Sequence, residues 1–242
     1  MRIDAYLCQN GITVSRNEAK SLLLAGAVSV NGKAVLKPSY DVIGDEEIKV
    51  DKSLKPFVSR GGIKLDGALT HFHIDVKGKK CLDVGASSGG FTDCLLKRGA
   101  EAVIAVDSGK DQLVESVRNN ARVTTIEGYN ARFMKREDFA FSPEIVVMDV
   151  SFISATYIIP AISACILDGG VFLCLIKPQF EVGRANIGKG GIVKDEKARA
   201  EAVEKVVSCA TEHGFSTVGV VRSDIKGGDG NVEFIGCFKK NI

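Results

Sequence analysis

The 242-residue sequence has little net charge, no closely spaced cysteines and no long apolar run. Its formal net charge is only +2, so any basic surface must be local. None of the seven cysteines shows C-x-x-C spacing, which argues against the usual metal and redox motifs and favours reduced, buried thiols. No apolar run approaches the ~20 residues that cross a bilayer, and Met1–Asp4 does not begin a secretory leader. We therefore expect a soluble, cytoplasmic protein with no membrane partner.

The most informative segment is glycine-rich and reads C-L-D-V-G-A-S-S-G-G-F from Cys81 to Phe91. An apolar run ends in an acid, a tight loop follows, and a helix begins. This is how a doubly wound sheet holds a nucleotide-like ligand at its switch point. The spacing acid-x-Gly-x-x-x-Gly-Gly differs from the dinucleotide pattern G-x-G-x-x-G and suits a cofactor without a pyrophosphate. It indicates S-adenosylmethionine.

A second acid, Asp107, follows the apolar run Ala102–Val106. An acid at the tip of the second strand can accept two hydrogen bonds from a ribose diol. An NAD(H) site uses the same acid and is the alternative, but the first-strand acid and the Gly-Gly pair favour S-adenosylmethionine. The predicted cofactor-binding residues are Asp83, Gly85, Ala86, Ser87, Ser88, Gly89, Gly90, Phe91, Asp107, Asn130 and Asp149.

Apolar segments of strand length alternate with helical segments from about residue 56 to residue 242. The predicted strands are Cys81–Val84, Val103–Asp107, Val123–Ile126, Ile145–Asp149, Val171–Ile176, Thr217–Val221 and Val232–Cys237. The predicted helices cover Ile63–Phe72 and follow Gly90, Lys110, Ser154 and Asp195. The alternation predicts an α/β fold, a Rossmann-like and mostly parallel sheet with helices on both faces.

Residues 1–55 are predicted to form a separate small α+β domain, and the polar stretch Asp51–Pro56 is its linker to the domain at 56–242. Ser15-Arg16-Asn17-Glu18 has the pattern of a capping box, and Gly26 is placed to end the helix. Asn31-Gly32, between alternating residues, is a strong hairpin signal.

This helix and hairpin resemble the small RNA-binding module shared by a ribosomal small-subunit protein, pseudouridine synthases and tyrosyl-tRNA synthetases. The resemblance implies contacts with structured RNA through its phosphates and shape. The alternative is a solvated charged face. The predicted RNA-binding residues are Arg16, Lys20, Asn31, Lys33 and Arg60.

Four ionisable residues lie at positions where catalytic groups could act on a bound ligand. Asp149 and Lys177 end the fourth and fifth predicted strands of the large domain, where ligands bind in open α/β sheets. Lys64 lies at the start of a helix, and Glu233 lies on a late strand. Burial at the end of an apolar strand disfavours the charged form of a lysine, which makes Lys177 a candidate general base. An ordinary salt-bridge cluster is the alternative for each residue taken singly.

Six motifs of the large domain resemble the TlyA family of 2′-O-ribose rRNA methyltransferases, which is close to the FtsJ class. They are R-G-G-x-K-L, D-x-G-A-x-x-G-G-F-T-D, V-D-x-G-x-x-Q-L, D-V-S-F-I-S, I-K-P-Q-F-E and G-N-x-E-F. The resemblance implies a Lys-Asp-Lys-Glu tetrad at Lys64, Asp149, Lys177 and Glu233. Lys177 would take the proton from a 2′-hydroxyl that Lys64 orients, Asp149 would hold Lys177, and Glu233 would steady Lys64. No metal is expected.

The resemblance also implies a target in rRNA. The short N-terminus is similar to the shorter TlyA form, for which a cytidine of large-subunit 23S rRNA is the expected target. Ser223-Asp224-Ile225 replaces the Ser-Pro-Ile of the family, close to Glu233. The alternatives are a non-catalytic RNA-binding or ribosome-assembly protein, a small-molecule or protein methyltransferase, and a membrane-lytic haemolysin. The sequence leaves the oligomeric state open.

Overall fold

The computed structural model describes residues 1–13, 16–51 and 57–242, without the side chains of residues 17, 18 and 21. It contains two compact units, Met1–Arg60 and Gly61–Ile242. The predicted capping box at Ser15 and Glu18 lies outside the described residues. The predicted domain boundary after residue 55 also lies outside them, so it stays a prediction.

The smaller unit packs two helices on a three-stranded antiparallel sheet. Its helices are α1 (Ile3–Gln9) and α2 (Arg16–Leu24), and its strand order is β2 (Lys33–Ala34), β1 (Val28–Val30), β3 (Ile48–Val50). The core residues are fully buried at helical spacing on the two helices and include Ile3, Leu7, Ala19, Leu22 and Leu23. The expected helix end is confirmed at Gly26, whose φ of +72° suits glycine.

The predicted hairpin is also present. Val30 pairs with Lys33, so Asn31 and Gly32 alone form the loop, with φ values of +49° and +76°. A two-residue turn with positive φ at both positions matches the twist of the flanking strands. The Asn31 side-chain oxygen accepts a hydrogen bond from the Glu47 amide at 2.9 Å, which attaches the hairpin to the chain before β3.

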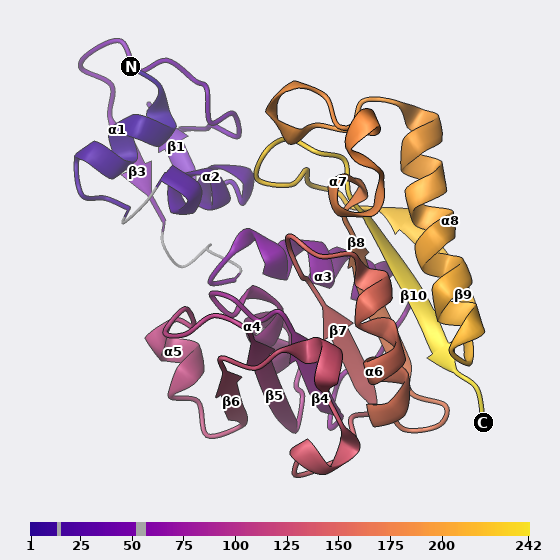
Figure 1. Ribbon diagram of the computed structural model, residues 1–242. Coiled ribbons are helices and arrows are strands. Elements are labelled where there is room, and N and C mark those ends of the chain that lie inside the picture. The colour runs from indigo at the N-terminus through magenta and orange to yellow at the C-terminus, as the bar shows by residue number, and fades with distance from the viewer. Residues whose placement is uncertain (14–15, 52–56) are drawn as a thin grey trace. The chain divides into compact units, whose positions relative to one another are not determined.

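The larger unit is built on a seven-stranded sheet with the order β6-β5-β4-β7-β8-β10-β9 (Figure 1). Its strands are β4 (Lys80–Val84), β5 (Ala102–Asp107), β6 (Val123–Glu127), β7 (Ile145–Met148), β8 (Val171–Ile176), β9 (Phe215–Arg222) and β10 (Phe234–Lys240). The strands β4 to β8 are parallel, whereas β10 runs antiparallel to both β8 and β9. The expected mostly parallel sheet is therefore confirmed.

Helices cover both faces of this sheet, because successive residues of β4 and β7 are buried although their side chains alternate between the faces. The helices are α3 (Arg60–His71), α4 (Gly90–Lys97), α5 (Glu115–Arg118), α6 (Ile159–Cys165), α7 (Pro178–Glu181) and α8 (Glu196–Glu212). Short 3₁₀ turns include η2 (Ala131–Phe133) and η4 (Ala155–Tyr157). No helix in the described part of the chain is long and apolar enough to span a membrane.

Candidate active site

The glycine-rich loop joins β4 to α4 at the switch point, where β5 and β7 lie on opposite sides of β4. Gly85 has a φ of +85°, and a Cβ there would lie 2.5 Å from the carbonyl oxygen of Asp149. Gly89, before the first turn of α4, has a φ of +92°. Only glycine combines these backbone angles with so close an approach. The loop can therefore lie directly against the chain that follows β7.

A pocket of about 670 Å³ opens between this loop and the tips of β5 and β7. Five of the predicted cofactor residues line it: Gly85, Ser87, Asp107, Asn130 and Asp149. The other six, Asp83, Ala86, Ser88, Gly89, Gly90 and Phe91, do not line the pocket and form the strand end, the turn and the start of α4. The lining residues Gln112, Tyr129 and Arg132 were not predicted. Gln112 belongs to the motif V-D-x-G-x-x-Q-L, whereas the only signal for Tyr129 and Arg132 was their proximity to Asn130 in the sequence.

Asp107 fixes the rim of the pocket. One of its carboxylate oxygens accepts a hydrogen bond from the Ser87 amide and the other from the Gly109 amide, both at 2.7 Å. A carboxylate oxygen has more than one lone pair, so each can still accept a hydroxyl of a ligand. The Asn130 side chain accepts from the Arg132 amide at 3.1 Å and caps η2 at the opposite rim.

Asp83 lies fully buried behind the loop. Its Oδ2 accepts a hydrogen bond from the Thr92 hydroxyl at 2.6 Å, whereas its Oδ1 is buried without a hydrogen-bond partner. Burial raises the pKa of Asp83 to about 7; the nearby charges of Asp149 and Asp107 add to the rise, and the Thr92 hydrogen bond opposes it. An orphaned acidic oxygen and two further acids beside one pocket fit a ligand that carries positive charge, as S-adenosylmethionine does.

The titration of Asp83 predicts a pH-dependent stability. Between the ordinary aspartate pKa of 3.8 and about 7, the folded protein holds a proton that the unfolded chain has lost. The stability that Asp83 contributes is thus complete below the ordinary pKa and lost as the pH rises through that window. We expect Asp83→Asn to gain stability relative to the unmodified protein over this range, in urea titrations at a series of pH values. Parallel pH curves for the two proteins would contradict this assignment.

The first lysine–carboxylate pair of the site joins Lys177 to Asp149. Lys177 Nζ lies 2.5 Å from Asp149 Oδ1 and donates to the Ser151 hydroxyl at 2.7 Å. The Lys177 and Asp149 side chains are 11 % and 22 % exposed, so the pair is sheltered but open to a ligand. The expected positions at the tips of adjacent parallel strands are present, since Asp149 follows β7 and Lys177 follows β8.

The second pair joins Lys64 to Glu233. Lys64, in the second turn of α3, places its Nζ 2.5 Å from Glu233 Oε2, and the two side chains are only 8 % and 3 % exposed. The prediction that Glu233 lies on a strand is corrected: β10 begins one residue later, at Phe234, and Glu233 ends the preceding loop. The conformation of the loop between β9 and β10, rather than hydrogen bonding within the sheet, therefore sets the position of the Glu233 carboxylate.

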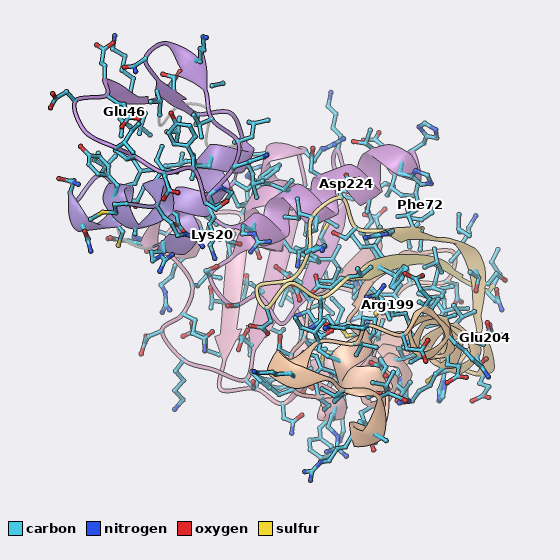
Figure 2. The ribbon with its side chains drawn as sticks, turned by 90° about the horizontal axis from the view of Figure 1, so that it is seen from above. Lys20, Glu46, Phe72, Arg199, Glu204 and Asp224 are labelled. Atoms are coloured by element: carbon cyan, nitrogen blue, oxygen red, sulfur yellow. The ribbon has the colours of Figure 1, made fainter. Side chains whose placement is uncertain are left out.

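Two glycines leave room for carboxylate side chains of the loop between β9 and β10, one on α3 and one within the loop. A Cβ at Gly67 would lie 2.6 Å from Asp224 Oδ2, so the absence of a side chain on α3 admits the loop, where Figure 2 labels Asp224. A Cβ at Gly227 would lie 2.4 Å from Glu233 Oε1. The Asp224 that replaces the proline expected in the family thus packs against α3, and the loop still delivers Glu233 to Lys64.

A second pocket, of about 320 Å³, adjoins the first. Its lining includes Lys177, Glu233 and Phe180, and it shares Ser151 and Phe152 with the larger pocket. The Phe152 side chain is 92 % exposed, and its ring centroid lies 5.4 Å from that of Phe180. The lysine–carboxylate pair of Lys177 thus stands where two adjacent ligands would meet.

The segment 183–194 closes one side of the second pocket. The buried Asn231 side chain accepts from the Val193 amide at 3.0 Å and donates to the Gly191 carbonyl at 2.9 Å. Arg199 on α8, labelled in Figure 2, donates to the Val193 carbonyl at 2.9 Å. This segment is therefore attached both to the loop that carries Glu233 and to α8.

The predicted RNA-binding residues have different surroundings. Arg16 pairs with the buried Asp4 at 2.9 Å, and Asn31 holds the hairpin, so both also stabilise the smaller unit. Lys33 is exposed and lines an open cavity of about 680 Å³ beside the hairpin, whereas Lys20 is half-buried. Arg60 begins α3. Their predicted role in RNA binding stays a prediction.

The described residues contain no group of three or more His, Cys, Asp or Glu side chains suited to a metal ion. They do contain a glycine-rich loop at the switch point, an acid-lined pocket and a paired lysine at its edge. On a Rossmann-like sheet this arrangement fits a nucleotide-like cofactor beside a reacting group, as methyltransferases have it.

Comparison with known proteins identifies the family. Residues 57–240 match the FtsJ-like methyltransferase model and residues 1–48 match the S4 domain. The chain therefore belongs to the FtsJ-like methyltransferases and carries an S4 domain at its N-terminal end.

The relatives that match nearly the whole chain are named either as hemolysins or as rRNA methyltransferases. The chain is 43 % identical to Hemolysin A of Brachyspira hyodysenteriae over 98 % of its own length and 99 % of that protein. It is also 43 % identical to the 16S/23S rRNA (cytidine-2′-O)-methyltransferase TlyA of Mycobacterium tuberculosis, over 96 % of its own length and 87 % of that protein. A solved structure from Streptococcus thermophilus, described as a hemolysin, matches with a TM-score of 0.77 and 40 % identity, over 100 % of this chain and 88 % of that one. The resemblance to the TlyA family is confirmed.

Proposed function

We propose that this protein transfers the methyl group of S-adenosylmethionine to a ribose 2′-hydroxyl of ribosomal RNA, with a cytidine of the large-subunit 23S rRNA as the target. The observation that carries the proposal is the position of Lys177, held by Asp149 and Ser151 where the two pockets adjoin. The name of the Mycobacterium tuberculosis relative supports this chemistry on rRNA. The cytoplasm, where rRNA is made and assembled, is the corresponding location.

In this proposal the larger pocket holds the cofactor, which supplies an electrophilic sulfonium methyl group when bound. Asp107 accepts from its ribose, Asn130 and Tyr129 border its base, and Asp149 favours its positive charge. Asp83 lies buried behind the loop and supports it through Thr92. The smaller pocket holds the target nucleoside. Lys177 would act as the base and take the proton of the 2′-hydroxyl while that oxygen forms its bond to the methyl carbon. The bond between this carbon and sulfur would break and leave its electron pair on sulfur, and Asp149 would orient the amine. Because the donor is already reactive, most of the rate comes from proximity and orientation.

Glu233 lines the target pocket, and Lys64 lies behind it as its ion-pair partner. Glu233 holds Lys64 Nζ by a short contact, which fixes the direction of the lysine side chain toward the ribose hydroxyl that it would orient. The S4 domain, through its exposed Lys33 and the other predicted contacts, would bind the RNA backbone. Neither unit requires a metal ion for these steps.

The test is transfer of a radiolabelled methyl group to separated large and small ribosomal subunits that lack the modification. Label in large-subunit rRNA, resistant to protease and located on a ribose, is the expected result. Label confined to the small subunit would overturn the choice of target. No label on either subunit or on precursor rRNA, despite tight cofactor binding, would favour the non-catalytic RNA-binding alternative. A membrane-lytic role is not favoured, because the relative named hemolysin matches nearly the whole chain, as the named methyltransferase does, and that match includes the FtsJ-like methyltransferase domain.

Phe152 is expected to stack on an RNA base next to the target ribose, because its ring is exposed at the junction of the two pockets. Base–aromatic stacking contributes about 1–3 kcal/mol. We therefore expect Phe152→Ala to raise the KM for rRNA by roughly tenfold or more, with the Kd of the cofactor little changed. Phe133→Ala, which removes an aromatic ring that is 67 % exposed elsewhere, is the matched control. Equal KM values for the two variants would contradict the stacking role.

A further inference from the structure

A buried carboxylate outside both pockets connects the two segments that carry Asp149 and Lys177. It belongs to Glu181, the last residue of α7, whose side chain is 2 % exposed. Its Oε2 accepts from the Ser154 hydroxyl at 2.5 Å, and its Oε1 accepts from the Ala155 amide at 2.7 Å. The carboxylate is thus bonded on both oxygens to the start of η4.

Lys205 of α8 completes this cluster. Its Nζ lies 3.2 Å from Glu181 Oε2 and donates to the Glu181 carbonyl at 3.1 Å. It also lies 3.4 Å from the Ser154 hydroxyl. The lysine is about half exposed, whereas the carboxylate is not, so the cluster is anchored from the surface of α8. We refer to Glu181, Ser154 and Lys205 as the α7–η4 clamp.

The clamp and the Lys177–Asp149 ion pair join the same two segments of the chain at two different places. Ser154 follows Asp149 on the segment after β7, and Glu181 follows Lys177 on the segment after β8. The Lys177–Asp149 contact joins the two segments near the sheet, and the clamp joins them again a few residues later. A single contact at the strand tips would leave each segment free to rotate about it. Two contacts fix both the separation and the orientation of Lys177 and Asp149.

Stability alone does not account for such a cluster. Removing a carboxylate from water costs several kcal/mol, and well-packed apolar side chains of similar volume are often as stabilising as a buried ion pair. The neighbouring core is apolar, with Ala155, Ile158 and Ile159 all buried. The hydrogen bonds of Glu181 therefore position the two segments more than they add to the stability of the fold.

We propose that Glu181 is a positioning residue for methyl transfer: it acts through Ser154 and the Ala155 amide to hold Asp149 against Lys177. The inference rests on the proposed function, because it assigns Lys177 as the base. Glu181 does not contact either ligand pocket, so its substitution should change the turnover rate rather than the affinity for the cofactor. Misplacement of a reacting group by about 1 Å can cost on the order of 10²-fold in rate.

The test compares kcat, the KM for rRNA and the Kd of the cofactor among clamp variants. Glu181→Ala is expected to lower kcat by about 30- to 100-fold with the Kd of the cofactor unchanged. Glu181→Gln retains an oxygen that can accept from Ser154 or Ala155 and should restore kcat to within about tenfold of the unmodified protein. In Glu181→Ala the KM for rRNA should stay close to that of the unmodified protein, whereas a general loss of structure would change kcat and KM together.

Further variants separate positioning from folding. Lys205→Met should lower kcat less than Glu181→Ala, whereas Lys197→Met, an 84 % exposed lysine on the same helix, should leave it unchanged. A folded Glu181→Ala variant with a kcat within about threefold of the unmodified protein would overturn the inference. If that variant does not fold, an unaltered kcat in both Glu181→Gln and Lys205→Met would overturn it. Absence of turnover by the unmodified protein would instead refute the proposed function itself.

Discussion

Lys177→Met is expected to abolish most methyl transfer while the protein still binds its cofactor. Methionine fills the space of the aliphatic stem but cannot accept a proton. General base catalysis typically contributes 10²–10⁴-fold, so kcat should fall by about that factor. Asp149 remains at the rim of the cofactor pocket, partly exposed, and its unpaired charge should not weaken binding of a cationic ligand. The measurements are single-turnover transfer of a radiolabelled methyl group to rRNA and calorimetric titration with S-adenosylmethionine.

Two comparisons make this result decisive. Lys197→Met removes an exposed lysine of α8 and should retain full activity. Lys177→Arg, whose guanidinium keeps its proton in proteins and so cannot act as a base, should be about as inactive as Lys177→Met. If Lys177→Met keeps activity within a few-fold of the unmodified protein, Lys177 is not the base and the assignment of the reaction centre is wrong.

Lys64→Met is expected to destabilise the larger unit strongly, because it leaves Glu233 with 3 % exposure and no ammonium beside it. Breaking a buried ion pair by removing one partner typically costs about 3–5 kcal/mol, since an uncompensated charge stays buried. Both side chains are almost completely buried, so solvent screening offers little relief. The free energy of unfolding, measured by urea titration, should fall by about that amount.

The double variant Lys64→Met/Glu233→Gln tests the cause. Without the buried charge, most of the lost free energy of unfolding should return although the lysine is still absent. The exposed pair Lys197 and Glu201, at 4.0 Å on α8, is the matched control, and Lys197→Met/Glu201→Gln should change stability little. If the double variant of the buried pair is as unstable as Lys64→Met, the loss comes from packing around the lysine rather than from Glu233.

The sequence predicted the fold well where local pattern decides the structure. Strands of the parallel sheet are apolar on both faces, so Cys81–Val84 and Val171–Ile176 could be recognised as buried strands. The Asn31–Gly32 hairpin could be predicted because few residue pairs tolerate positive φ at both positions. Predictions were less exact where apolar periodicity is weak: the helix expected after Lys110 begins only at Glu115 and is a single turn.

The site was predictable to a smaller extent. The positions of Asp149 and Lys177 follow from the rule that parallel strands end at one edge, but the partner of Lys64 is 169 residues away in the sequence. No periodicity connects Lys64 to Glu233, and only the family resemblance suggested that pair. The α7–η4 clamp was not predicted at all. A glutamate such as Glu181 beside a proline-initiated turn has the pattern of a solvated residue, and its burial depends on packing against η4 and α8.

The place of β10 has a consequence for how the protein is synthesised. This strand is the last of its sheet to leave the ribosome, yet it inserts between β8 and β9, which are made earlier. Until it is translated, β8 presents an open edge, β9 has no neighbour to pair with, and Lys64 lacks its carboxylate. A partly synthesised chain therefore exposes a strand edge that can pair with other chains, and its reaction centre is incomplete. Activity can therefore begin only after β10 and the residue before it, Glu233, have left the ribosome and paired with their partners.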